Sequence, residues 1–133
     1  LMGYKLVSYI SSKATIAQNV EIGSNCFILE NNNLQPFTIV EDNVVLWSGN
    51  HIGHDSKIGQ HSFIASHVVI SGCVEIGEQC FLGVNSTLVN NIKIGDRTLI
   101  GAGTLIQKDA ESDGVYVLNG AQRSRIPSHR IKL

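Results

Sequence analysis

An aliphatic residue occupies every sixth position of this chain from Ile10 to Ile106. A small or β-branched residue usually stands two positions earlier, and Asn32 and Asn50 are the exceptions. A fixed short period marks a solenoid, and six-residue repeats are typical of β-helices. The frame runs for 17 positions without a slip: Ile10, Ile16, Ile22, Ile28, Leu34, Val40, Leu46, Ile52, Ile58, Ile64, Ile70, Ile76, Leu82, Leu88, Ile94, Ile100 and Ile106.

Strand alternation explains the repeat. Positions two apart on a strand face the same side, so the small and the aliphatic residue both point inward, and the residue between them points outward. The next residues must turn the chain, and the glycines that often follow the aliphatic position ease that turn. Three such strands close a triangle, so we predict an all-β parallel β-helix of about six coils.

The unbroken repeat predicts one domain. We expect residues 10–106 to form the β-helix. Residues 1–9 should lead into the first coil and cover its open edge, and residues 107–133 should form a loop and a closing tail with a short strand at 115–118.

Composition excludes several classes of function. A net charge of −1 and a pI near 6.6 disfavour a nucleic-acid binder, which usually carries a basic stripe. No apolar run reaches the roughly 18 residues of a membrane span, and residues 1–10 lack the pattern of a signal peptide. Cys26 and Cys80 hold inward positions and no C-x-x-C pair occurs, so we expect reduced thiols and a cytoplasmic protein.

The repeat and its motifs resemble the hexapeptide-repeat acyltransferases. The segments G-H-D-S-K-I-G at 53–59 and F-L-G-V-N-S at 81–86 are most similar to one branch, which contains sialic-acid O-acetyltransferases and acetyltransferases of nucleotide-linked amino sugars. The resemblance implies a left-handed β-helix, although parallel crossovers in general are right-handed. In that branch a small α/β domain often precedes the β-helix, so we expect a fragment or a relative without that part.

The resemblance also implies an activity and partners. It implies a transferase that uses acetyl-CoA and no metal, and that acetylates an amino or hydroxyl group of a sugar, most simply a nucleotide-linked amino sugar. Outward apolar residues such as Phe27, Phe63 and Phe81 would be exposed on a single prism. Such patches mark interfaces, and the family's arrangement is a homotrimer with shared clefts.

His54 and Asp55 are the predicted catalytic pair. A neutral histidine can take the proton from an attacking amine or hydroxyl near pH 7. The adjacent carboxylate can fix the tautomer of the ring and raise its basicity. The resemblance places the family's catalytic histidine at this point of the motif, so we predict His54 as general base and Asp55 as its orienting group.

Gly72 lies one coil after His54. Stacking should place its backbone about one strand spacing away, where an outward N–H can stabilise the oxyanion of a tetrahedral intermediate. The resemblance implies the same role, together with contact to the coenzyme.

Five further residues complete the predicted site. In the family the pantetheine arm lies between two subunits and bonds backbone groups of later coils, which by motif are those of Val84 and Ala102. Lys108 is placed to meet a phosphate near the last coil. His51 should point out from a flat face and His67 from a different corner, and we predict that both contact the substrate.

Two alternatives stay open. A zinc enzyme of the carbonic-anhydrase type resembles this fold and uses three histidines, two of them five apart, but here the spacings are 3, 7 and 6. A non-catalytic trimerisation domain is the other. We expect His61 to belong to a polar corner column with Asn43 and Gln79. The acceptor sugar, the acyl group and the choice of N- or O-acetylation stay open, because the same base serves each.

Overall fold

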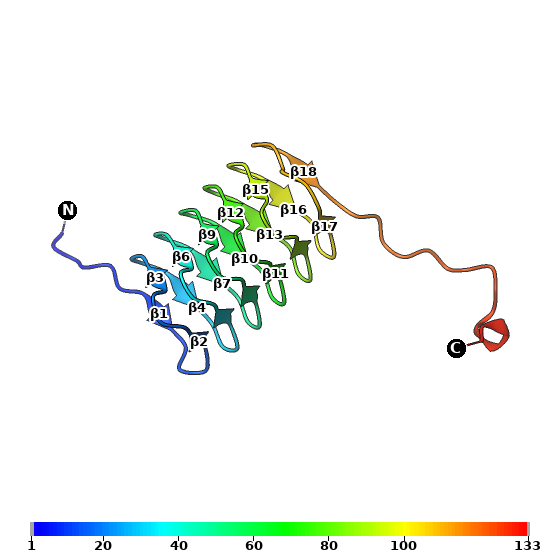
Figure 1. The fold of residues 1–133 in the computed structure, drawn as a ribbon, viewed down its shortest axis with the longest axis horizontal. Coiled ribbons are helices and arrows are strands. Elements are labelled where there is room, and N and C mark those ends of the chain that lie inside the picture. The colour runs from blue at the N-terminus through cyan, green and yellow to red at the C-terminus, as the bar shows by residue number, and fades with distance from the viewer. Residues whose placement is uncertain (1, 133) are drawn as a thin grey trace.

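A computed structural model describes residues 2–132 of the chain; Leu1 and Leu133, which belong to the predicted lead-in and tail, lie outside the described residues. In this described part of the chain, eighteen two-residue strands wind into a stack of coils, each with three sides (Figure 1). All strand pairs are parallel. This confirms the predicted all-β solenoid of about six coils, and it is consistent with the left-handed β-helix.

The strands form three flat sheets, one for each side of the triangle. Sheet A contains β1 (Tyr9–Ile10), β4 (Phe27–Ile28), β7 (Val45–Leu46), β10 (Phe63–Ile64), β13 (Phe81–Leu82), β16 (Leu99–Ile100) and β18 (Val115–Tyr116). Sheet B contains β2 (Thr15–Ile16), β5 (Asn33–Leu34), β8 (His51–Ile52), β11 (Val69–Ile70), β14 (Thr87–Leu88) and β17 (Leu105–Ile106). Sheet C contains β3 (Glu21–Ile22), β6 (Ile39–Val40), β9 (Lys57–Ile58), β12 (Glu75–Ile76) and β15 (Lys93–Ile94).

The second residue of each strand forms the core. From Ile28 to Ile100 every member of the six-residue frame is at most 2% exposed. Cys26 and Cys80 are buried beside them as predicted, and burial raises the pKa of the Cys80 thiol. The frame therefore fills the prism, and the chemistry is left to residues that point outward.

The inward side chains of the first coil are more exposed to solvent than we expected. Ile10 is 42% exposed, although it belongs to the frame. Residues 1–9 were predicted to cover this edge. Residues 2–7 instead extend away from the coils (Figure 1), with Met2 and Tyr4 exposed, whereas the Ser8 hydroxyl donates to Gly23 O at 2.8 Å and accepts from Cys26 N at 2.9 Å. Within residues 2–132 no coil packs on the outer side of this one, so its inward side chains have described neighbours on one side only.

The three outer faces differ in chemistry. Sheet A presents a continuous apolar row: Tyr9, Phe27, Val45, Phe63, Phe81, Leu99 and Val115. Sheet C carries charges, and Glu41 pairs with Lys57 at 2.7 Å and raises its pKa. Sheet B is mixed and carries His51.

The chain beyond β17 closes the last coil and then leaves it. Ala110 bridges to Ile94 and β18 adds to sheet A. The tail then runs away from the prism to a single turn, η1 (Ser128–Arg130) (Figure 1). No helix of residues 2–132 could cross a membrane.

Candidate active site

His54 lies at the corner where the chain passes from sheet B to sheet C, which we call the B–C corner. It comprises residues 53–56, 71–74 and 89–92 of three successive coils. Ser56 is buried and holds the inner side, because its Oγ donates to Ser71 O at 3.0 Å and accepts from Val74 N at 3.1 Å. Ser56 thus joins two successive coils on the inner side of the corner, and the outer side chains do not take part in these bonds.

The His54 ring is oriented by its neighbour. Nδ1 lies 2.7 Å from Asp55 Oδ2, within a charge-assisted hydrogen bond. Asp55 has φ +56°, a left-handed conformation that aspartate tolerates, and this turn brings the two adjacent side chains together. With Nδ1–H donating to the carboxylate, Nε2 keeps its lone pair and can accept a proton.

Gly72 faces that nitrogen, one coil further on. A Cβ added to Gly72 would lie 2.6 Å from Nε2 and 2.8 Å from Cε1 of His54. A side chain at this position would therefore displace the ring. The predicted base and the predicted oxyanion donor are neighbours, and the absence of a side chain at Gly72 makes this possible.

Sequence reasoning missed two residues at this corner. Asn90 stands one coil after Gly72, and its Oδ1 accepts the Gly72 N–H at 3.2 Å, so this N–H points outward but has a partner. Cys73 stands one coil after Asp55, and its N–H donates to His54 O at 2.9 Å. Both positions could have been predicted, because Asn90 lies one coil after Gly72 and Cys73 lies one coil after Asp55.

The remaining predicted residues are spread over sheet B and its two edges. His51 points outward from sheet B, as we expected, and is half-buried. His67, Val84 and Ala102 lie at the corner between sheets A and B, where the His67 ring covers Gly49. Lys108 follows β17 on the edge of sheet B that also carries His54. The two edges are five residues, or about 16 Å, apart.

The three-histidine zinc centre of the alternative interpretation does not form within residues 2–132. Among these residues the structure brings one set of metal-ligating atoms together, those of His54, Asp55 and Cys73. His61 lies at the corner between sheets C and A, where its Nδ1 accepts from Asn43 at 3.1 Å, in agreement with the predicted stacking of these two residues.

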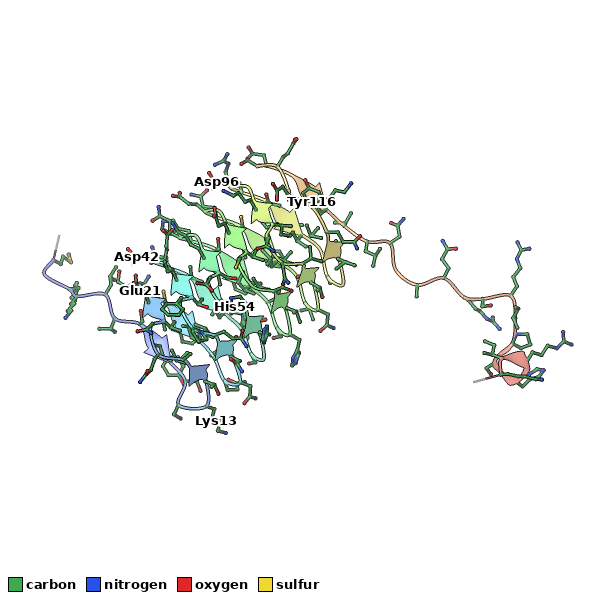
Figure 2. The ribbon with its side chains drawn as sticks, in the orientation of Figure 1. Lys13, Glu21, Asp42, His54, Asp96 and Tyr116 are labelled. Carbon is green, nitrogen blue, oxygen red and sulfur yellow. The ribbon has the colours of Figure 1, made fainter. Side chains whose placement is uncertain are left out.

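The main surface hollows among residues 2–132 lie away from His54. A charged hollow on the outer face of sheet C is lined by Glu75, Lys93 and their neighbours, another lies lower on the same face near Glu21, and a third involves residues 123–128 of the tail. His54 stands on an open corner, 56% exposed (Figure 2). A site there needs a further surface to enclose a substrate.

The repeat matches a known family model. The bacterial transferase hexapeptide (six repeats) model matches residues 37–72 and 73–108, which are more than half of the chain. The chain belongs to the bacterial transferase hexapeptide family. The matched residues include all of the B–C corner described above.

Curated members of the family are similar in sequence to this chain. The UDP-3-O-acylglucosamine N-acyltransferase of Delftia acidovorans is 32% identical over 101 residues, which cover 76% of this chain and 30% of that enzyme. The enzyme of the same name from Bordetella pertussis is 35% identical over 101 residues, which cover 76% and 27%. The chain thus spans less than a third of these relatives.

Solved structures share the fold. PerB from Caulobacter crescentus, in complex with CoA and GDP-perosamine, superposes with a TM-score of 0.84 at 24% identity, over 85% of this chain and 55% of PerB. The acetyltransferase domain of PglB from Neisseria gonorrhoeae, in complex with acetyl coenzyme A, gives 0.81 at 25% identity, over 84% and 54%. The chain spans about half of each.

Proposed function

We propose that this chain transfers an acetyl group from acetyl-CoA to an amino or hydroxyl group of a sugar, in the simplest case a nucleotide-linked amino sugar, in the cytoplasm. The observation that carries the proposal is the arrangement of His54, with Asp55 on Nδ1 and Gly72 against Nε2. The relatives and neighbours named as acyltransferases or acetyltransferases of amino sugars support the reaction class.

His54 Nε2 is the general base in this mechanism. As the acceptor nitrogen or oxygen attacks the thioester carbonyl, its proton passes to Nε2 and a tetrahedral intermediate forms. Asp55 holds the ring in the tautomer that leaves Nε2 free and stabilises the imidazolium. The C–S bond then breaks, CoA leaves as the thiol, and the proton taken up by His54 is available to the departing sulfur.

The Gly72 N–H is the proposed oxyanion donor. A backbone donor aimed at the developing charge stabilises the intermediate more than the ground state. In the structure this N–H is held by the exposed side chain of Asn90. Asn90 must therefore rotate away when the thioester carbonyl arrives, and an exposed side chain can do so at little cost.

The coenzyme and the acceptor require a second copy of the chain. Gly72 and Lys108 lie on one edge of sheet B, and Val84 and Ala102 lie on the other. We propose a homotrimer in which a neighbouring copy supplies Val84 and Ala102 to the cleft that contains Gly72 and Lys108. His51, on the same coil as His54, and His67 would then contact the sugar.

The outer face of sheet A is the proposed contact surface between copies. Its apolar row is exposed in the single chain, with Phe27 at 44%, Phe81 at 42% and Leu99 at 40%. Phe63 and Phe81 stack with ring centroids 5.6 Å apart. A contiguous apolar patch of this kind usually marks an interface. The same observation favours the second candidate function, a trimerisation domain without catalysis.

A thiol-release assay tests the proposal. Purified chain is incubated with acetyl-CoA and a panel of nucleotide-linked amino sugars, each matched with its hydroxy analogue, and free CoA is measured against a mixture without acceptor. We expect at least one acceptor to raise the rate of release, and the matched pair to separate N- from O-acetylation. A folded oligomer that releases no thiol with any acceptor contradicts catalysis and favours the trimerisation domain.

A further inference from the structure

We propose that His54, Asp55 and Cys73 form a binding site for a thiophilic divalent cation, with zinc as the expected ion. One ring nitrogen, one carboxylate oxygen and the thiol sulfur all lie within 4.8 Å of one another. Ligand atoms around a tetrahedral zinc are about 3.5 Å apart, given metal–ligand distances of about 2.0–2.3 Å. Small side-chain rotations would therefore bring the three atoms to zinc.

The backbone fixes the three ligands relative to one another. Asp55 and Cys73 occupy equivalent left-handed positions on successive coils, with φ +56° and +57°. Cys73 N–H donates to His54 O at 2.9 Å, which ties the cysteine to the histidine. The prism is rigid here, because Ser56 links the same two coils from inside. Only side-chain torsions must change when the ion binds.

The surroundings leave room for a fourth ligand. All three side chains are exposed, so an ion can arrive without any opening of the fold. The His54 ring lies against the backbone of Gly72, so no side chain at position 72 covers the exposed side of the three ligands. Three protein ligands with an open fourth position taken by water is an ordinary arrangement for zinc.

The chemistry of the donors selects the type of ion. Calcium and magnesium take oxygen ligands, and only Asp55 offers one. A thiolate together with an imidazole favours zinc, and cobalt(II) is suited to the same tetrahedral set of ligands. Cys73 is the residue that makes the site thiophilic, because His54 and Asp55 alone offer two ligands.

A cation bound at this site would inhibit the proposed acetyl transfer. A metal on His54 takes the lone pair of the nitrogen that binds it and ties the ring to Cys73, so the ring no longer serves as a free base. The cation would thus inhibit acetyl transfer. This consequence rests on the proposed function, but the existence of the cation-binding site does not depend on it.

Cobalt titration tests the site without reference to activity. The metal-free oligomer is titrated with cobalt(II) and then with zinc, for the natural chain, Cys73→Ser and the control Cys26→Ser, whose thiol is buried. We expect a thiolate-to-cobalt charge-transfer band in the natural chain and in the control, its loss on adding zinc, and no band in Cys73→Ser. The zinc Kd should rise by at least about 100-fold in Cys73→Ser, since even the loss of a residue that only supports a ligand costs 10–100-fold.

Absence of the band in the natural chain, or its persistence in Cys73→Ser, would overturn the proposal. A parallel assay separates this result from the proposed function. Zinc should stop acetyl transfer by the natural chain and leave Cys73→Ser active. If no acetyl transfer occurs at all, the cobalt band still decides whether the metal site exists.

Discussion

Two corners of the same prism carry exposed histidines in different surroundings. At the B–C corner His54 pairs with Asp55, and its free nitrogen faces Gly72. The C–A corner comprises residues 59–62 and their equivalents in other coils. There His61 has the left-handed backbone conformation that Asp55 has at the B–C corner, and Asn43 donates a hydrogen bond to the Nδ1 of His61. Figure 2 shows Asp42 and Asp96 of the C–A corner along one edge of the stack, away from His54.

The inner sides of the two corners are alike. Ser56 bridges Ser71 and Val74, and Ser62 bridges Gly77 and Cys80 in the same way, with bonds of 3.0–3.1 Å. The outer sides differ. At the C–A corner, side chains of successive coils hydrogen-bond to one another, as Asn43 and His61 do. At the B–C corner, Gly72 stands one coil above His54 and has no side chain to form such a bond. The surroundings of an exposed histidine on this prism are therefore set by the residue that stands one coil above it.

The largest expected effect separates the two histidines directly. His54→Ala should lower the turnover number by roughly 10²–10⁴-fold, because the general base is lost. His61→Ala, the matched variant at the other corner, should retain the natural rate. Steady-state kinetics on oligomers of verified size check this. Equal rates for both variants would remove the distinction between the corners.

Two glycines of the B–C corner separate catalysis from folding. Gly72→Ala should displace the His54 ring and lower turnover by about 10²-fold while the melting temperature hardly changes, because its Cβ meets a movable side chain. Gly53→Ala should instead lower the melting temperature, because its Cβ would lie 2.5 Å from the Ser71 backbone. Turnover and thermal unfolding of both variants are compared with Gly120→Ala, which has open space around it.

The two buried serines test whether the inner sides are equivalent. Ser56→Ala leaves the Val74 N–H without its partner, and Ser62→Ala does the same to Cys80. Each should lower the free energy of unfolding by about 1–3 kcal/mol, since a buried donor loses its hydrogen bond. Denaturant unfolding measures both, with the exposed Ser12→Ala as control. A large loss in the free energy of unfolding for one of the two variants alone would show that the inner sides of the corners differ.

Replacing Asp55 by asparagine weakens the orientation of His54 and keeps the turn, because asparagine also tolerates a left-handed backbone. Both partners are more than half exposed in the single chain. An exposed pair contributes up to about 1 kcal/mol, so turnover should fall roughly fivefold with little change in KM. A loss as large as that of His54→Ala would instead mean that the pair is buried in the active oligomer.

The smallest effect belongs to the last coil of the C–A corner. Arg97 donates to both carboxylate oxygens of Asp113, at 2.6 and 3.0 Å, and this lowers the pKa of Asp113. A lowered folded-state pKa stabilises the fold above the unfolded value of about 3.9, and the contribution is lost as the pH falls through the folded pKa. Asp113→Asn should therefore melt slightly lower than the natural chain at pH 7, and the difference should vanish in acid. A difference that persists in acid would contradict this.

The fold was predictable from the sequence because the inward positions obey one rule. Each inward aliphatic residue from Ile28 to Ile100 is buried as the six-residue frame requires. The same frame placed Gly72 beside His54. The first coil departed from the prediction because covering an end depends on contacts outside the repeat, and no periodicity specifies where residues 2–8 lie.

Outward contacts between coils were harder to predict. The hydrogen bond from Gly72 to Asn90 and the approach of Cys73 to His54 depend on side-chain rotamers as well as on register. The Asn32 and Asn50 exceptions have a clear reason in the structure, because both are buried and their amides bond backbone groups inside one corner.

Titration calorimetry of acetyl-CoA into the purified oligomer tests the central claim most directly. The proposed coenzyme contacts lie at the B–C corner of one copy and in later coils of that copy and its neighbour, so we expect saturable binding of about one molecule per chain. The Gly72→Ala variant should bind more weakly, because the displaced ring occupies the path of the thioester. A well-folded oligomer that binds no acetyl-CoA would contradict the proposed acetyl transfer and favour a trimerisation domain.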